Sequence, residues 1–190
     1  SYNHILTSVD GHNGKFVWKM KRANEVNKPS EEVSTDKINI LDWIPAIVPG
    51  TVLNSLVYNK VYPEPYYGLN NKLESGIIPD LYHAGRDFYT YWFRTEFKLE
   101  KNSFEKKKIW LQVDGINYRA EVWLNGSMVG NISGMFQQRA IDITDKALLN
   151  KENVLALKIY PSYMPGTIKP KGGKSLGATG EFQNGGNGEI

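Results

Sequence analysis

The residues best suited to a chemical role gather in one irregular stretch, residues 62–71. It holds Tyr62, Tyr66 and Tyr67, followed by Asn70 and Asn71. Aromatic rings stack on the C–H faces of sugars, and amide side chains both donate hydrogen bonds to hydroxyl groups and accept them. The combination therefore suits a carbohydrate ligand. The alternative is a loop stiffened by its two prolines, in which the tyrosines only pack.

Other patterns single out no chemistry. The three histidines lack the i+4 spacing of a zinc-binding helix, and there is no cysteine. Calcium ligands need not be contiguous, so a calcium site built from Asp114, Asp142 or Asp145 stays open, as does a strand-end cap at Asp142. No spacing of serine and histidine marks a triad, and 20 acidic residues offer many carboxylate pairs without ranking one. These patterns therefore assign no catalytic residue, no metal ligand and no cofactor, while calcium binding is left undecided.

Length and charge exclude several further classes of protein. A (β/α)8 barrel needs roughly 250 residues, and the chain has 190. Its 23 lysines and arginines against 20 acidic residues leave a net charge of +3, too small a surplus to indicate nucleic acid. No apolar run reaches the roughly 18 residues that span a bilayer, and no signal peptide is visible at the start. We predict neither nucleic acid nor a membrane as a partner.

Period-2 patterns after residue 88 predict the strands that would position the tyrosine–asparagine stretch. Strands are expected at residues 89–99, 109–113, 120–124, 127–132, 139–143 and 154–160. Asn125 and Gly126 predict a type I′ hairpin turn between two of them. Trp92, Trp110 and Trp123 lie opposite the aliphatic residues of their strands, so some of them are expected in the core. Strands so closely spaced, without intervening helices, predict an all-β antiparallel sandwich.

The first half of the chain is less regular. We expect a strand at residues 16–20, a loop at 24–37 and an edge-like extended segment at 42–50. A short helix at residues 52–59 and a long loop at 60–88 follow. Pro45 and Pro49 prevent a helix in the extended segment, and Thr51 stands at an N-cap position. A loop as long as the last one is usually functional.

Motifs along residues 40–160 resemble a known family. They are VPGTV (48–52), YPEPYYG (62–68), YWFRTEF (91–97), LQVDGINYRAEVWLNG (111–126), GMF (134–136), IDIT (141–144) and ENVL (152–155). The series is similar to the N-terminal sugar-binding domain of family 2 glycoside hydrolases. The two upstream motifs resemble the β-mannosidase and exo-β-D-glucosaminidase branch more than the β-galactosidases.

The resemblance implies a jelly-roll sandwich, galactose-binding-domain-like, with one or two short helices. It also implies that catalysis belongs to glutamates on a (β/α)8 barrel that follows an immunoglobulin-like domain, neither of which fits here. We expect a non-catalytic domain at residues 1–165, with its core at about 40–160. Residues 166–190, which hold 8 of the 18 glycines, are expected to be a linker or loop leading to a downstream domain.

The resemblance further implies a set of sugar-contacting residues. Asn70 or Asn71 matches the asparagine that follows the proline-rich loop, and residues 133–136 match a second loop. In β-galactosidases the second loop carries a substrate-binding aspartate. No carboxylate lies between Val129 and Ala140, so a galactoside contact of that type is not expected. The implied substrate-binding residues are Tyr66, Tyr67, Asn70, Asn71, Asn131, Ser133 and Phe136.

The function expected from the resemblance is lining the substrate pocket of a retaining exo-β-glycosidase, bacterial and periplasmic or secreted. The partners expected are the carbohydrate substrate and the two downstream domains, and the chain alone is expected to be inactive. Two alternatives stay open. In the first alternative, the chain is a free-standing carbohydrate-binding module. In the second, it is a structural sandwich that only buttresses a catalytic barrel.

Overall fold

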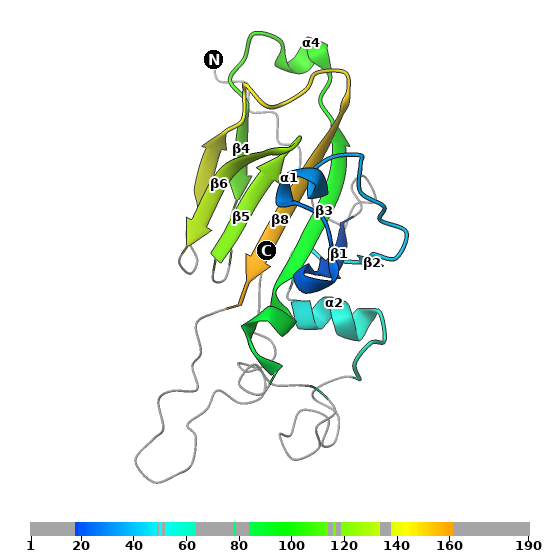
Figure 1. The fold of residues 1–190 in the computed structure, drawn as a ribbon. Helices are drawn as coiled ribbons and strands as arrows, with labels where there is room; N and C mark the ends of the chain where they lie inside the picture. The colour runs from blue at the N-terminus through cyan, green and yellow to red at the C-terminus, as the bar shows by residue number, and fades with distance from the viewer. Residues whose placement is uncertain are drawn as a thin grey trace, which may run out of the picture.

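The computed structural model describes residues 18–48, 50, 52–63, 78, 84–113, 116, 119–133 and 138–161. Within them, two antiparallel sheets form (Figure 1). The larger has the order β2-β1-β3-β8-β5-β6, made of Ile44–Pro45, Lys19–Arg22, Tyr91–Lys98, Glu152–Tyr160, Arg119–Leu124 and Ser127–Ser133. The smaller sheet pairs β4 (Trp110–Val113) with β7 (Arg139–Asp142). Five short helical elements connect the described strands, namely η2 (Ala23–Glu25), α1 (Ser30–Val33), α2 (Val52–Tyr58), η4 (Arg86–Tyr89) and α4 (Lys101–Phe104).

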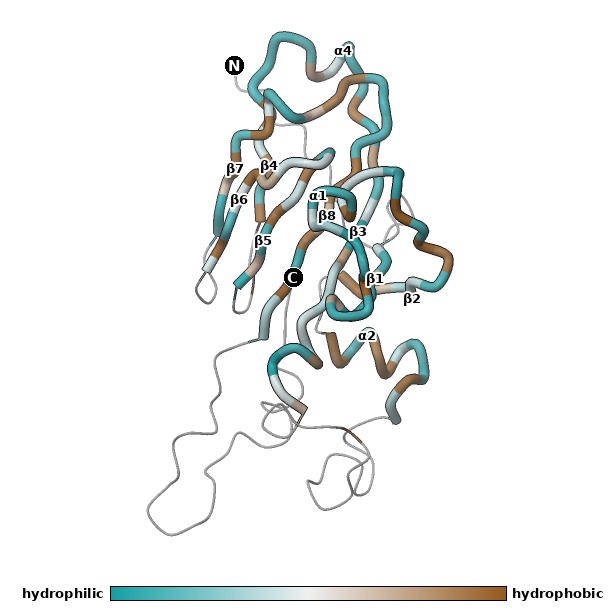
Figure 2. Tube along the Cα trace, in the orientation of Figure 1, coloured by the Kyte–Doolittle hydropathy of each residue, from teal (hydrophilic) through white to brown (hydrophobic). Residues whose placement is uncertain are grey.

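The main core lies between the two sheets. Alternation along β3 turns Tyr91, Phe93 and Phe97 inward, where all three are buried. Ile109 and Val113 belong to the same cluster from the side of the smaller sheet. Figure 2 shows hydrophobic residues along the central strands and α2, whereas the turn that carries α4 is largely hydrophilic. Burial of this apolar face drives the pairing of the sheets.

A glycine permits the close approach of the two sheets at one edge. A Cβ atom added to Gly130 in β6 would lie 2.6 Å from Cδ1 of Ile141 in β7. The hairpin between β5 and β6 has its own backbone requirement, since Asn125 and Gly126 have φ values of 50° and 88°. Both residues therefore adopt the left-handed conformation of a type I′ turn, which confirms the predicted hairpin.

A second core covers the outer face of the larger sheet. The segment that carries α1 crosses this face, and Figure 1 shows α1 in front of the strands. Val33 and Trp43 from this segment pack against Trp92, Trp123 and Ala156 of the sheet. Trp92 and Trp123 are thus core residues, as expected for some of the tryptophans, whereas 56% of Trp110 is exposed.

The predicted strands and the helix at α2 are confirmed, with ends shifted by one to three residues. The expected edge-like segment contains β2, which is the outermost strand of the larger sheet. Two expectations were wrong in detail. Residues 24–37 contain part of η2 and all of α1, and η4 begins inside the expected loop 60–88. A further helix, α4, separates β3 from β4. These elements span three or four residues, too few to produce a helical hydrophobic period.

Candidate functional site

The strand registers bring the ends of five strands, β1, β3, β8, β5 and β6, to one end of the larger sheet. Across this end, Arg22 faces Tyr91, and Arg119 faces both Tyr160 and Ser133. We call it the loop end, defined by these five residues. Residues 114–118 immediately precede Arg119, and residues 134–137 immediately follow Ser133. Figure 1 shows α2 and η4, which flank the tyrosine–asparagine stretch, at the same end.

Two of the predicted contact residues lie on β6 at the loop end. Asn131 faces Glu121 and Ser133 faces Arg119 across the β5–β6 pair. The period of two puts both side chains on the outer face, and both residues are exposed. Oδ1 of Asn131 accepts a hydrogen bond from Nε of Arg119 at 3.3 Å. The other five predicted contacts lie outside the described residues: Tyr66, Tyr67, Asn70, Asn71 and Phe136.

Next to Asn131, the outer face carries a row of aromatic and charged side chains. Glu121 accepts hydrogen bonds from the Tyr160 hydroxyl at 2.8 Å and from Nε1 of Trp123 at 3.3 Å. Arg119 lies 4.9 Å and Lys158 5.5 Å from the centre of the Tyr160 ring. Burial, followed by the hydrogen bond to Glu121, raises the pKa of Tyr160 above its ordinary value. Tyr160 therefore stays a neutral donor at physiological pH, and its proton is engaged by Glu121.

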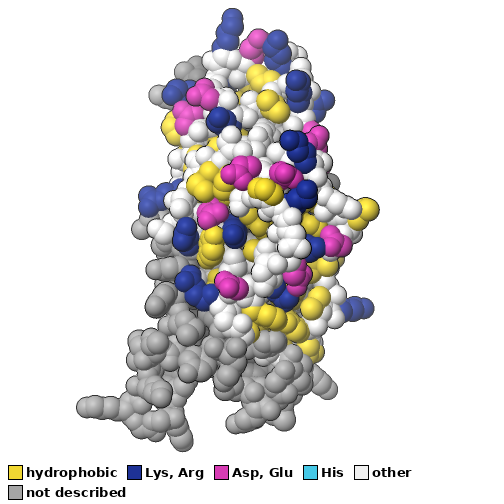
Figure 3. Space-filling model, in the orientation of Figure 1, with side chains coloured by type: hydrophobic (Ala, Val, Ile, Leu, Met, Phe, Trp, Pro, Cys, Tyr) yellow, Lys and Arg dark blue, Asp and Glu magenta, His cyan; other side chains and the backbone are white. Residues whose placement is uncertain are grey.

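Charges of both signs are interspersed over the face shown in Figure 3, without a single-sign patch. Several of the acidic groups have local partners. Asp142, at the end of β7, accepts hydrogen bonds from the Thr144 amide at 3.1 Å and hydroxyl at 2.6 Å, and pairs with Lys108 at 3.2 Å. These contacts, led by the Thr144 hydroxyl, lower the pKa of Asp142. Asp142 is thus a strand-end cap.

The described residues contain no cluster of three or more histidine, aspartate or glutamate side chains that could hold a metal ion. The same residues contain no helix with the length and hydropathy required to cross a membrane. Of the other two aspartates considered for calcium, Asp145 lies within the described residues and Asp114 lies outside them.

Asparagines of two motifs that carry the resemblance, WLNG and ENVL, form a structural network. The Asn125 side chain donates to the carbonyl of Lys146 at 2.8 Å and to Oδ1 of Asn153 at 2.9 Å, and accepts from the Val154 amide at 2.9 Å. Asn153 is fully buried and exchanges hydrogen bonds with the backbone of Leu148 in both directions. The asparagines of WLNG and ENVL therefore join the hairpin turn to the loop before β8.

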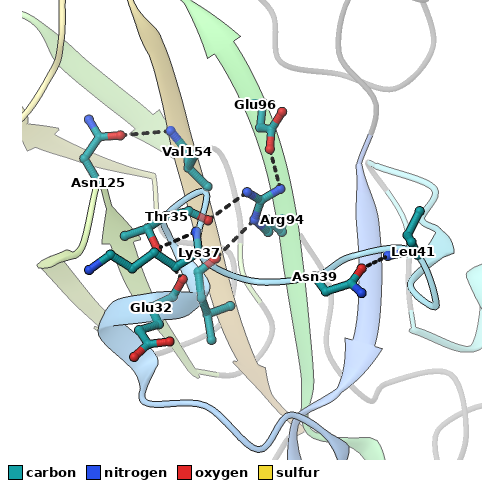
Figure 4. A network of polar contacts seen from close by, with 10 residues as sticks. Glu32, Thr35, Lys37, Asn39, Leu41, Arg94, Glu96, Asn125 and Val154 are labelled. Atoms are coloured by element: carbon teal, nitrogen blue, oxygen red, sulfur yellow. Dashed lines mark hydrogen bonds and ion pairs between the residues drawn. The ribbon is translucent and has the colours of Figure 1, made fainter.

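Arg94 is a structurally important residue that sequence reasoning missed. It lies on the outer face of β3 with 3% of its side chain exposed. Its Nε donates to the Val33 carbonyl at 3.1 Å and its second terminal nitrogen to the Thr35 carbonyl at 3.0 Å, while Glu96 lies 2.7 Å from the first. Figure 4 shows the guanidinium group between Glu96 and the chain around Thr35. The available signal was a charged residue directly after Trp92 and Phe93 in a predicted strand.

The fold places the chain in a class, that of all-β antiparallel sandwiches. Comparison with known proteins then gives the family. Residues 18–174 match the family model described as "Glycosyl hydrolase 2 galactose-binding domain-like". The chain belongs to this family of domains of the family 2 glycosyl hydrolases. The fold prediction of a galactose-binding-like sandwich is thereby confirmed.

Relatives with curated names include a mannosylglycoprotein endo-beta-mannosidase from Lilium longiflorum, 39% identical over 160 residues, which cover 83% of this chain and 16% of that protein. A beta-mannosidase from Rattus norvegicus is 30% identical over 102 residues, covering 54% of this chain and 11% of the rat protein. An exo-chitosanase structure from Amycolatopsis orientalis superposes with a TM-score of 0.64 at 23% identity, covering 77% of this chain and 16% of that one. The chain thus spans about one sixth of the length of the lily relative.

Proposed function

We propose that this chain is the non-catalytic, sugar-binding domain at the N-terminal side of a family 2 β-glycosidase, and that it lines the substrate pocket. The observation that carries the proposal is the register that brings Tyr91, Arg119 and Ser133 to one end of the sheet. Two of the predicted contact residues, Asn131 and Ser133, lie on β6 at this end. We assign the sugar contacts to Tyr66, Tyr67, Asn70, Asn71, Asn131, Ser133 and Phe136.

In this proposal the hydrolysis belongs to downstream immunoglobulin-like and (β/α)8 barrel domains of the same enzyme. A retaining glycosidase needs two carboxyl groups about 5 Å apart, one of them free to take and give a proton. The described carboxylates Glu121 and Asp142 are engaged by neighbouring hydroxyl, indole and ammonium groups. We therefore assign neither Glu121 nor Asp142 a catalytic role.

We propose β-mannosides as the substrate class, because the lily and rat relatives are named for mannosidase activity. We favour an exo-acting enzyme, which removes the terminal sugar. The lily relative is named as endo-acting, so attack on an internal mannoside is the second candidate. Oligosaccharides blocked at the non-reducing end separate the two, since only an endo-acting enzyme hydrolyses them.

The test of the pocket-lining role uses the full-length enzyme. We expect Asn70→Ala and Asn71→Ala to raise KM for a nitrophenyl β-mannoside or to lower kcat, because each removes an amide that binds sugar hydroxyls. Asn39→Ala is the matched control, since Asn39 is an exposed amide outside the predicted contact set, and its Oδ1 accepts a hydrogen bond from the Leu41 amide at 2.9 Å. Unchanged kinetics in both pocket variants would favour the buttress alternative.

Three further measurements address the remaining parts of the proposal. The 190-residue chain alone should hydrolyse no nitrophenyl glycoside, and measurable turnover would contradict the assignment of catalysis to another domain. Binding of the isolated chain to a glycan array at sub-millimolar concentration would favour the free-standing module. We also propose that the enzyme acts in the periplasm or outside the cell, which fractionation of the source cells tests.

A further inference from the structure

Asn131, a predicted sugar contact on β6, has its amide group oriented by Arg119 of β5. Nε of Arg119 donates a hydrogen bond to Oδ1 of Asn131 at 3.3 Å. An arginine Nε carries a hydrogen and cannot accept one, so only the carbonyl oxygen of the amide can face it. The NH2 group of Asn131 is therefore directed away from Arg119. Because Asn131 is exposed, its two N–H donors are open to a ligand at the loop end.

Two other groups hold Arg119 in place. A terminal nitrogen of its guanidinium group lies 3.7 Å from Oε1 of Glu121, and the guanidinium carbon lies 4.9 Å from the centre of the Tyr160 ring. A planar guanidinium group can face a carboxylate and an aromatic ring at the same time. Although 42% of the Arg119 side chain is exposed, the three contacts together favour one arrangement of it.

Glu121, the anionic partner of Arg119, is itself anchored to the core. Only 14% of its side chain is exposed. Its Oε1 accepts a hydrogen bond from the Tyr160 hydroxyl at 2.8 Å, and its Oε2 accepts one from Nε1 of Trp123 at 3.3 Å. Trp123 belongs to the second core, beneath the α1 segment. A continuous series of contacts therefore runs from this core, through Glu121 and Arg119, to the exposed amide of Asn131.

We propose that Arg119 is a positioning residue, which fixes the Asn131 amide so that its NH2 group is directed to the sugar. The role rests on the proposed function, because it presupposes that Asn131 contacts substrate. A free asparagine side chain on a surface has several rotamers, and ordering them costs free energy when a ligand binds. An amide that is oriented in advance avoids much of this cost. Sugar hydroxyl and ring oxygens are suitable acceptors for its two donors.

The experiment is a double-mutant cycle in the full-length enzyme, with KM and kcat measured on a nitrophenyl β-mannoside. Arg119→Met removes the charge and the donors but keeps a stem of similar length. It is combined with Asn131→Ala, which removes the amide that Arg119 orients. Lys158→Met is the matched control. Lys158 also lies near the Tyr160 ring, at 5.5 Å, but it is on β8, which β5 separates from β6.

We expect Asn131→Ala to raise KM about tenfold and Arg119→Met to raise it about fivefold, with kcat within about twofold of wild type in both. In the double variant, KM should equal that of Asn131→Ala, because Arg119 then has no amide to orient. Arg119→Lys should raise KM by less than Arg119→Met does, since it keeps the charge near Glu121 but not the planar fork. Lys158→Met should leave KM unchanged.

The positioning role is overturned if Arg119→Met leaves KM unchanged, or if it raises KM by the same factor when Asn131 is already alanine. In the second case Arg119 would act on the substrate by a route that does not involve Asn131. If Arg119→Met fails to fold, Arg119→Lys in the same two backgrounds decides in the same way, because it retains the charge beside Glu121.

The Asn131 variant separates this inference from the proposed function. If Asn131→Ala raises KM and Arg119→Met does not, the positioning role is overturned and the sugar contact stands. If Asn131→Ala leaves KM unchanged, Asn131 is not a substrate contact, and the positioning role fails with it. The pocket-lining role then depends on the Asn70→Ala and Asn71→Ala results, which the Arg119 variants do not affect.

Discussion

Replacing Arg94 by methionine should destabilise the domain, because Arg94 is a buried charged residue that ties β3 to the α1 segment. Methionine has a similar length but cannot donate to the Val33 and Thr35 carbonyls, which lie 3.1 and 3.0 Å from the Arg94 nitrogens. Hydrogen bonds from a charged donor contribute about 1.5–3 kcal/mol each. Methionine avoids the desolvation cost of the guanidinium group, so we expect a net loss of about 2–4 kcal/mol.

Urea denaturation, monitored by tryptophan fluorescence, measures this loss. Trp43, Trp92 and Trp123 report on it because all three belong to the core between the α1 segment and the larger sheet. A change of this size should lower Tm by about 10 °C in a domain of this length. Glu96→Gln is the control. The Glu96 carboxylate is 41% exposed, so its loss should cost under about 1 kcal/mol.

The reasoning would be refuted if Arg94→Met unfolds within about 0.5 kcal/mol of wild type, a change expected of an ordinary surface substitution. Packing of Val33 and Trp43 alone would then hold the segment on the sheet. A loss as large in Glu96→Gln would also refute it, since the ion pair rather than the two carbonyls would then be the dominant contact.

Three other changes test the remaining contacts. Asn153→Ala should cost about 2–4 kcal/mol in urea denaturation, because Asn153 is fully buried and its loss leaves the Leu148 amide without its acceptor and the Leu148 carbonyl without its donor. Burial raises the pKa of Tyr91 to about 12 from 10.0. The stability that the neutral Tyr91 phenol contributes is therefore complete below pH 10 and is lost between pH 10 and 12. Tyr91→Phe should flatten the fall in Tm over that range. Asp142→Ala should lower Tm by removing the acceptor for Thr144, and added calcium should leave the Tm of the wild type unchanged.

The sequence was informative wherever one local rule governed the structure. The period of two located β3 and β8, the Asn125–Gly126 pair located the hairpin, and the two prolines located an edge segment. The family followed from motifs whose asparagines, Asn125 and Asn153, are the ones that hold the hairpin against the loop before β8. For the site, the sequence predicted residue types suited to sugar, and only Asn131 and Ser133 of that set fall within the described residues.

By itself, then, the sequence determined the all-β class, the hairpin and the family, because strand period and turn chemistry depend on residues close together in the chain. Only the tertiary structure decided which polar residues serve the fold. The Arg94–Val33 and Arg22–Phe88 contacts join residues 61 and 66 positions apart, and no local pattern encodes such distances. The strand order likewise decided that Arg22, Arg119 and Ser133 meet at one end, because register between distant strands forms only when the sheet closes.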